Sequence, residues 1–500
     1  PMPNSEDIPK DRTTHQKNPI NIAGDEKFGI KSVLKKTGRE GKSKLGPSEN
    51  EIKRILDHFR NGTLRPAEEL ATLLTKRFPM DPFGWAALGL ALRQTGRLRE
   101  SIAPLQRSVA LSTEDAEAHN NLGVALQELG RFEEAEASLK EAVMLKPGFS
   151  LAHSNLGNTQ QRLGKKKEAE VSHKNAIALQ PDRADAHTNL GFMLLEAGRL
   201  DEAEAAYRQA IALRPDNPEA FNGLGITLKS LGRLGEARAS HDQGLSLRPS
   251  DKDALLNRSI LLFDTNEFEL ALSDADASNT ERSKCIGLEA LYALGRIDEI
   301  LVRIEREYQL NPHSLPLAAF AAFISQTIAQ DVANRFCPNP MAFLHFSSIH
   351  HHLEGASEFI SALTNELENI PTVWEPPTQS TKGGYRTRVH MNLFEHRCST
   401  IARLESIILD EVDTYVSMFR EESCVFIKEW PLRMQLGRWH VVLKQQGYQS
   451  PHIRPTAWLS GVIYLRVVPS LGKDEGAIEF SLNGKRYSNP KAPTLVHQPT

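Results

Sequence analysis

Small and apolar residues recur in one fixed register along the first half of the chain, between more polar stretches. Two sets of glycines, one set of alanines and one set of prolines each repeat every 34 residues. The sets are Gly89, Gly123, Gly157, Gly191 and Gly225; Gly62, Gly96, Gly130, Gly164, Gly198 and Gly232; Ala135, Ala169, Ala203, Ala237 and Ala271; and Pro147, Pro181, Pro215 and Pro249. Each interval predicts two antiparallel helices. The first glycine set and the alanines allow close packing, the second glycine set ends the first helix in a turn, and proline ends the second helix.

This register resembles the tetratricopeptide repeat family. The units run from about residue 48 to 279, match most strongly between 82 and 251, and are followed by a degenerate unit at about 280–312. We therefore expect an all-α tetratricopeptide solenoid over residues 48–312. The resemblance implies a right-handed array whose concave surface, formed by the first helices, holds a protein or peptide.

A row of asparagines occupies one position of the predicted first helices, two residues before the helix glycine. The row consists of Asn121, Asn155, Asn189 and Asn257, and Gly223 and Ala87 interrupt it. A carboxamide both donates and accepts hydrogen bonds, so such a row is able to hold an extended peptide backbone. The row resembles the asparagine ladder of the repeats in O-linked N-acetylglucosamine transferases. The alternative is that these asparagines only support local packing.

A different, mixed domain is predicted after Pro312, where the 34-residue register ends. Residues 313–340 are expected to connect the domains. Helical apolar spacing covers 357–369 and 400–419, and from Val425 onward the pattern changes to strands, at 439–443, 459–468 and 477–480. Short strands with Gly- and Pro-bearing loops favour a jelly roll. The predicted fold is thus multidomain, with an α+β domain over residues 341–500 that has a double-stranded β-helix (jelly-roll) core.

A second resemblance rests on GYQSPHIRP at 447–455 and WLSGVIYL at 458–465, with KGGYRT at 382–387 and GAIEF at 476–480. These segments resemble the Fe(II)/2-oxoglutarate-dependent oxygenase family that is often fused behind tetratricopeptide repeats. The resemblance covers roughly residues 340–500. It implies an iron cofactor, 2-oxoglutarate as co-substrate, and hydroxylation of a C–H bond.

Carried over by position, the resemblance makes His452 the first iron ligand. The place of the second ligand is held by Arg454, which stays protonated and has no lone pair for a metal. Three interpretations remain open: an exogenous ligand fills the gap, the domain is catalytically dead, or another side chain of the chain supplies the ligand. Tyr464 is a candidate for hydrogen-bonding the co-substrate, although an aromatic residue on a strand is more often part of the core.

The last strands of such a domain are expected beyond residue 500. The distal histidine and the basic residue that pairs with 2-oxoglutarate follow the first ligand by two or more strands in this family. His497 is the only late histidine, and its surroundings favour the approach to the missing strand over the ligand strand itself. We therefore expect the domain to be incomplete at its C-terminal end.

Composition and charge argue against nucleic-acid binding, a disulfide framework and a membrane span. The 500 residues carry 60 Lys and Arg against 63 Asp and Glu, a formal net charge of −3, which gives no bulk attraction to nucleic acid. Four cysteines without a CxxC pair indicate neither a disulfide framework nor a zinc ribbon, and no run of 18 apolar residues indicates a membrane span. We expect a cytoplasmic protein with no nucleic-acid or membrane partner, and a disordered tail over residues 1–46.

Several histidines are interpreted as structural. His350, His351 and His352, with His345 nearby, are consecutive or loosely spaced and so make a poor preformed ligand set, which favours a surface or packing role. His119, His153 and His187 share the 34-residue step and are typical of repeat composition.

Two function classes follow. The main hypothesis is an Fe(II)/2-oxoglutarate-dependent oxygenase whose repeats bind a protein or peptide substrate. The alternative is a non-catalytic tetratricopeptide scaffold with a degenerate oxygenase-like domain. A glycosyltransferase, suggested only by the asparagines, is disfavoured because no nucleotide-sugar-binding α/β pattern follows residue 312.

Overall fold

A computed structural model shows two compact units that divide between residues 249 and 250. No helix among the residues it describes is both long and apolar enough to cross a membrane. The described residues are 46–311, 313–330, 332, 336–337, 339–370, 372–374, 381–387, 393–395, 398–431, 441–449, 463, 465, 478–480 and 495–497.

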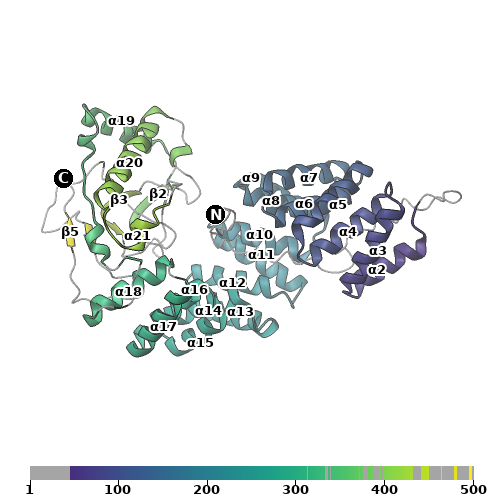
Figure 1. Ribbon diagram of the computed structural model, residues 1–500, viewed down its shortest axis with the longest axis horizontal. Helices are drawn as coiled ribbons and strands as arrows, with labels where there is room; N and C mark the ends of the chain where they lie inside the picture. The colour runs from purple at the N-terminus through teal and green to yellow at the C-terminus, as the bar shows by residue number, and fades with distance from the viewer. Residues whose placement is uncertain are drawn as a thin grey trace, which may run out of the picture. The chain divides into compact units, whose positions relative to one another are not determined.

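Helix pairs build the first unit, as the 34-residue register predicts (Figure 1). We call the first helix of each pair the A helix and the second the B helix. The helices are α2 (Glu49–Arg60), α3 (Leu64–Arg77), α4 (Pro82–Gln94), α5 (Leu98–Leu111), α6 (Ala116–Glu128), α7 (Phe132–Leu145), α8 (Ser150–Arg162), α9 (Lys166–Leu179), α10 (Ala184–Glu196), α11 (Leu200–Leu213), α12 (Pro218–Ser230) and α13 (Leu234–Leu247). Each helix contacts the next, and the A helices α4, α6, α8, α10 and α12 also contact their neighbouring A helices. The A helices therefore form one continuous surface, called here the A-helix surface.

The glycine of each A helix lies against a large side chain of the B helix that follows. A Cβ at Gly89, Gly123, Gly157, Gly191 or Gly225 would lie 2.5–2.9 Å from the side chain of Leu105, Leu139, His173, Tyr207 or His241, respectively. Real Cβ atoms do not approach so closely, so only glycine fits at these positions. The predicted role of this glycine set is confirmed.

The ends of the helices also follow the sequence. Gly62, Gly96, Gly130, Gly164, Gly198 and Gly232 all have φ between +69° and +81°, the left-handed conformation that ends a helix at low cost when the residue is glycine. The B helices α7, α9, α11 and α13 each end two residues before one of the periodic prolines. Both predictions are confirmed.

The second unit begins with five more helices. They are α14 (Lys252–Asp264), α15 (Phe268–Ser278), α16 (Glu281–Ala293), α17 (Ile297–Leu310) and α18 (Leu315–Ile328). The degenerate unit expected at 280–312 is the pair α16 and α17. Helix α18 lies within the stretch expected to be a connection, and its Phe320 and Phe323 share a core with Leu291, Ile300 and Ile304.

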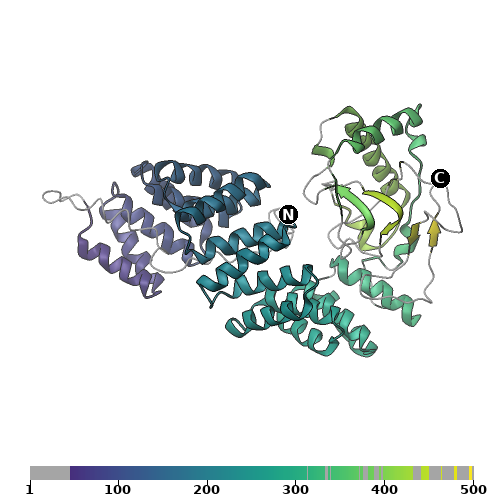
Figure 2. The same cartoon turned by 180° about the vertical axis from the view of Figure 1, so that it is seen from behind.

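A small antiparallel sheet follows, with strand order β1-β2-β3. Its two longer strands, β2 and β3, are the green and yellow-green arrows in Figure 2. The strands are β1 (Thr372–Trp374), β2 (Thr381–Thr387) and β3 (Val441–Gln449), and Tyr385 lies opposite both Trp374 and Val442. Two further strands, β4 (Ile478–Phe480) and β5 (Leu495–His497), form an antiparallel pair. These described strands do not by themselves make up a jelly roll, so the double-stranded β-helix core stays a prediction.

Both predicted C-terminal helices are confirmed, as α19 (Ala356–Glu368) and α20 (Ser399–Met418). The predicted start of the strands at Val425 is wrong, because α21 (Val425–Lys428) is a short helix. It buries Phe426 and Ile427 in a cluster of aromatic residues, so tertiary packing outweighs the strand preference of this apolar run. Three single turns of 3₁₀ helix complete the described elements: η2 (Pro340–Phe343), η3 (Ile349–His351) and η4 (Leu393–Glu395).

Adding a β-carbon at Gly123 is expected to destabilise the first unit. The new Cβ would lie 2.6 Å from Cγ of buried Leu139 and 3.3 Å from the carbonyl oxygen of Ala135. We expect Gly123→Ala to lower the free energy of unfolding by about 1–3 kcal/mol, the usual cost of overpacking. Urea denaturation measures this difference.

Gly235 provides the matched control for that substitution. It is exposed in the first turn of α13, and no atom lies within 4 Å of its Cβ position. Gly235→Ala should therefore leave the unit unchanged or stabilise it by up to about 1 kcal/mol through helix propensity. Equal losses in the two variants would contradict the close packing of the A and B helices.

Candidate binding surface

The predicted asparagines lie on A helices, where they also join successive repeats. Asn155 Nδ2 donates to Asn120 Oδ1 at 2.9 Å, and Asn189 Nδ2 donates to Ser154 Oγ at 3.1 Å. Asn121 and Asn155 are 7% and 5% exposed, whereas Asn189 is half-buried. Asn257, also half-buried, lies on α14 in the second unit. The carboxamides of Asn155 and Asn189 thus each use one N–H in a hydrogen bond to the preceding repeat. Their role in binding a peptide stays a prediction.

Side chains near the ends of the A helices make the same kind of contact. Gln161 Nε2 donates to Glu196 Oε2 at 2.6 Å, and Arg93 Nη1 pairs with Glu128 Oε1 at 3.1 Å. Each contact spans 35 residues, one more than the repeat period, so it joins one repeat to the next. Burial raises the pKa of Glu128 even though Arg93 acts to lower it. Part of the A-helix surface is therefore already engaged in holding the repeats together.

The periodic histidines anchor the turn that precedes each A helix. Nε2 of His119, His153 and His187 lies 3.0 Å from the carbonyl oxygen of the residue six positions earlier. The indole N–H of Trp85 makes the same contact with Pro79 in the first matching repeat. Because a carbonyl oxygen only accepts, Nε2 carries the proton in each histidine. These contacts support the interpretation of the histidines as structural residues.

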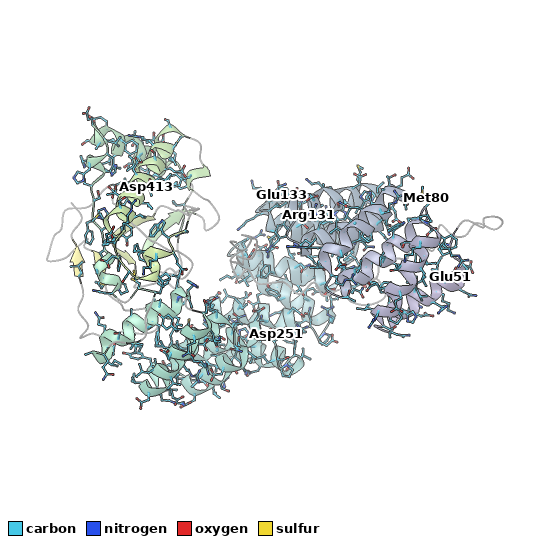
Figure 3. All side chains as sticks on the ribbon, viewed as in Figure 1. Glu51, Met80, Arg131, Glu133, Asp251 and Asp413 are labelled. Carbon is cyan, nitrogen blue, oxygen red and sulfur yellow. The ribbon has the colours of Figure 1, made fainter. Side chains whose placement is uncertain are left out.

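A series of ion pairs lies next to the turns between the A and B helices. It was not predicted from the sequence. After four of the turn glycines, the basic residue that follows pairs with a glutamate 29 residues earlier, at 2.6–2.9 Å. The pairs are Arg97–Glu68, Lys165–Glu136, Arg199–Glu170 and Arg233–Glu204. Arg131, shown in Figure 3, instead pairs with Glu134 at 2.6 Å. Most of these side chains are partly exposed, so each pair contributes at most about 1 kcal/mol. The recurring glycine-plus-basic dipeptide was the signal in the sequence.

A carboxylate in the second unit gathers two histidines and a serine. Glu411 on α20 accepts hydrogen bonds from His345 Nε2 at 2.9 Å, His352 Nε2 at 2.5 Å and Ser347 Oγ at 2.7 Å. Burial acts to raise the pKa of Glu411, but these hydrogen bonds more than offset it and hold the pKa at about 2. The cluster ties residues 345–352 to α20, which agrees with the packing role expected for His345 and His352.

The predicted oxygenase residues cannot be placed from this structure. His452, Arg454 and Tyr464 lie outside the described residues. The backbone of His497 belongs to β5, and its side chain is outside the described set. Within the described ranges, no group of three or more His, Cys, Asp and Glu side chains is arranged to hold a metal ion.

Family models identify the helix pairs. A model described as TPR repeat matches residues 89–130 and 193–232, and models described as tetratricopeptide repeat match residues 116–149 and 174–205. The chain therefore contains tetratricopeptide repeats. No curated protein matches the sequence.

Several solved structures resemble the repeat part. PilF of Pseudomonas aeruginosa is 23% identical with a TM-score of 0.38, covering 42% of this chain and 97% of PilF. A tetratricopeptide repeat protein from Parabacteroides merdae is 20% identical with a TM-score of 0.41, covering 48% of this chain and 96% of its own. YrrB, described as a TPR protein with an unusual peptide-binding site, is 22% identical with a TM-score of 0.29, covering 36% of this chain and 95% of YrrB.

Replacing Glu411 by glutamine is expected to loosen the second unit in a pH-dependent way. Loss of the carboxylate should lower the free energy of unfolding by about 1–3 kcal/mol at pH 7. The folded pKa lies below the ordinary value of 4.5, so the wild-type chain keeps this stabilisation above pH 4.5 and loses it as the pH falls toward 2. The difference between the wild type and Glu411→Gln should therefore shrink between pH 4.5 and pH 2.

Thermal unfolding followed over this pH range tests the prediction. Asp413→Asn is the matched control, because Asp413 lies exposed two residues away on α20 (Figure 3). If Glu411→Gln and Asp413→Asn behave alike at pH 7, the cluster does not stabilise this unit.

Proposed function

We propose that this protein is an interaction scaffold whose tetratricopeptide repeats bind an extended peptide on the A-helix surface. The observation that carries the proposal is the contact of successive A helices α4, α6, α8, α10 and α12. In a curved stack of helix pairs, the helices on the inner side approach one another, so these helices are the ones expected to face a ligand. The remaining support comes from the side chains on them.

The side chains of α8 favour the backbone of a peptide over a charged group as the ligand. Within 13 residues this helix carries four carboxamides, Asn155, Asn158, Gln160 and Gln161, and no acidic residue. Asn158 and Gln161 are half-buried, so part of each side chain is open to solvent. Backbone N–H and C=O groups of an extended chain offer one donor and one acceptor per residue, the combination that carboxamides match.

The contacts between repeats prepare this surface for binding. Asn155 and Asn189 are each held by a hydrogen bond to the preceding repeat. A side chain already fixed in place loses less conformational entropy when a ligand binds. Each of the two carboxamides has a second N–H and a carbonyl oxygen, and these are the groups that we propose bond to the peptide. We therefore propose that the asparagines act both in packing and in binding.

The oxygenase hypothesis is kept as a second candidate because β3 ends at Gln449, three residues before His452, so a strand leads into the motif. The donor set does not fit the two-histidine-one-carboxylate arrangement of such irons, since His452 offers an imidazole nitrogen and Arg454 offers no lone pair. This mismatch is why the scaffold is proposed first. Iron and 2-oxoglutarate remain inferences from the resemblance alone.

Iron content tests the second candidate directly. The full chain, purified without added chelator, is compared with its His452→Ala variant by metal analysis. If His452 is an iron ligand, the wild type should retain iron and the variant should lose most of it. Equal iron contents in the two proteins would remove the oxygenase hypothesis and leave the scaffold proposal untouched.

Replacing Asn121, Asn155 and Asn189 together by alanine is expected to weaken peptide binding. The probe is a 12-residue peptide selected on the wild-type chain from a random library, and fluorescence polarisation gives the Kd. Loss of three hydrogen-bonding groups at roughly 1 kcal/mol each should raise Kd at least about tenfold. Circular dichroism checks that the variant stays helical.

Asn175→Ala is the matched control, because Asn175 is exposed on the B helix α9. It removes the same chemical group and should leave Kd unchanged. An unchanged Kd in the folded triple variant would remove the peptide-binding role of the asparagines. A wild-type chain that selects no peptide at all would contradict the scaffold proposal itself.

A further inference from the structure

Two cysteines that are 87 residues apart in the sequence meet in the second unit. Cys337 follows α18, and Cys424 directly precedes α21. The backbone N–H of Phe426 donates to the carbonyl oxygen of Phe336 at 2.9 Å. This bond brings the two chain segments side by side, with Cys337 directly after Phe336 and Cys424 two residues before Phe426.

The side chains of the two cysteines also lie in one cluster, packed with Phe336, Phe426 and Tyr415. Burial, together with the neighbouring Cys424, raises the pKa of Cys337 to about 12. Burial and the two neighbouring sulfur atoms also raise the pKa of Tyr415. The shared cluster and the backbone hydrogen bond therefore place the two thiols near each other.

The two thiols differ in their exposure to solvent. Cys337 is 8% exposed, whereas Cys424 is only partly buried. Both are present as thiols. A small oxidant is therefore expected to react with Cys424 before Cys337.

We propose that Cys337 and Cys424 form a reversible disulfide when the protein meets a hydroperoxide. In the first step the thiolate sulfur of Cys424 attacks one peroxide oxygen, the O–O bond breaks, and a sulfenic acid and hydroxide result. In the second step the sulfur of Cys337 attacks the sulfenic sulfur, the S–O bond breaks, and the thiol proton leaves with the hydroxyl group as water. Overall, two thiols lose two electrons and two protons, and one hydrogen peroxide becomes two waters.

The disulfide would add a covalent bond to a junction that is held by packing and by the backbone hydrogen bond between Phe426 and Phe336. The cluster around the two cysteines includes Ala318 and Leu315 of α18 and Tyr415 of α20. A covalent bond here would close a loop of 87 residues that contains α19, α20 and the strands β1 and β2. Closing a long loop restricts the unfolded chain strongly, so oxidation is expected to stabilise this unit.

The remaining two cysteines are internal references. Cys285 lies on α16, where burial raises the pKa of its thiol. Cys398 Sγ donates to Glu366 Oε2 at 2.7 Å. Neither is held against another cysteine by a contact comparable to that of Cys337 and Cys424, so both should stay alkylatable after oxidation.

The test uses the reduced full-length chain, which is treated with hydrogen peroxide while folded, then unfolded in guanidinium chloride and alkylated with N-ethylmaleimide so that buried thiols also react. We expect the number of alkylated thiols to fall from four to two and tryptic mass spectrometry to find one linked peptide pair containing residues 337 and 424. Dithiothreitol should restore all four thiols. The melting temperature of the oxidised chain should rise by about 4 °C or more.

Two variants separate the proposal from its alternatives. Cys424→Ser should abolish the linked pair, and Cys398→Ser should retain it. Because Cys424 is partly exposed, its serine variant is expected to fold, which a thermal melt confirms. The proposal is overturned if Cys337 and Cys424 remain fully alkylated, if the bridge joins other cysteines, or if Cys424 stops at sulfinic or sulfonic acid.

Discussion

The repeats depend on one steric constraint, the missing β-carbon in each A helix. At Gly89, Gly123, Gly157, Gly191 and Gly225 a large side chain of the B helix occupies the space that a Cβ would fill. This contact fixes the distance between the two helices of a pair, and the left-handed turn glycines fix the angle at which the B helix leaves. The same two devices recur every 34 residues, so every pair has the same geometry and the A helices line up on one side.

This steric constraint fixes the spacing of the A and B helices but allows different side chains opposite the glycine. The large residue behind the glycine is leucine, tyrosine or histidine, and burial holds the pKa of His173 at about 4, so this imidazole is neutral near pH 7. Polar ladders then run along the stack, with the carboxamide contacts on the A helices and the ion pairs behind the turns. Individually weak, they act mainly to set each repeat against the next. A surface stiffened in this way would lose little entropy on binding the proposed peptide.

The second unit is organised differently, around long-range contacts between chemically unlike groups. Glu411 gathers His345 and His352, and an aromatic cluster joins α18 to α20 and α21. None of these contacts repeats along the chain. The two cysteines of the aromatic cluster share this property, since they lie 87 residues apart in the sequence.

The sequence alone determined the repeats, because the contacts that build them are local and recur in register. The glycine and proline positions predicted the helix pairs and their ends, and the helices at α19 and α20 followed from apolar spacing. Only the tertiary structure decided that residues 425–428 are helical, that Asn155 and Asn189 bond to neighbouring repeats, and that Glu411 holds two histidines. It also brought Cys337 to Cys424. Contacts between residues far apart in the chain leave no period in the sequence, so a single sequence gives no signal from which to predict them.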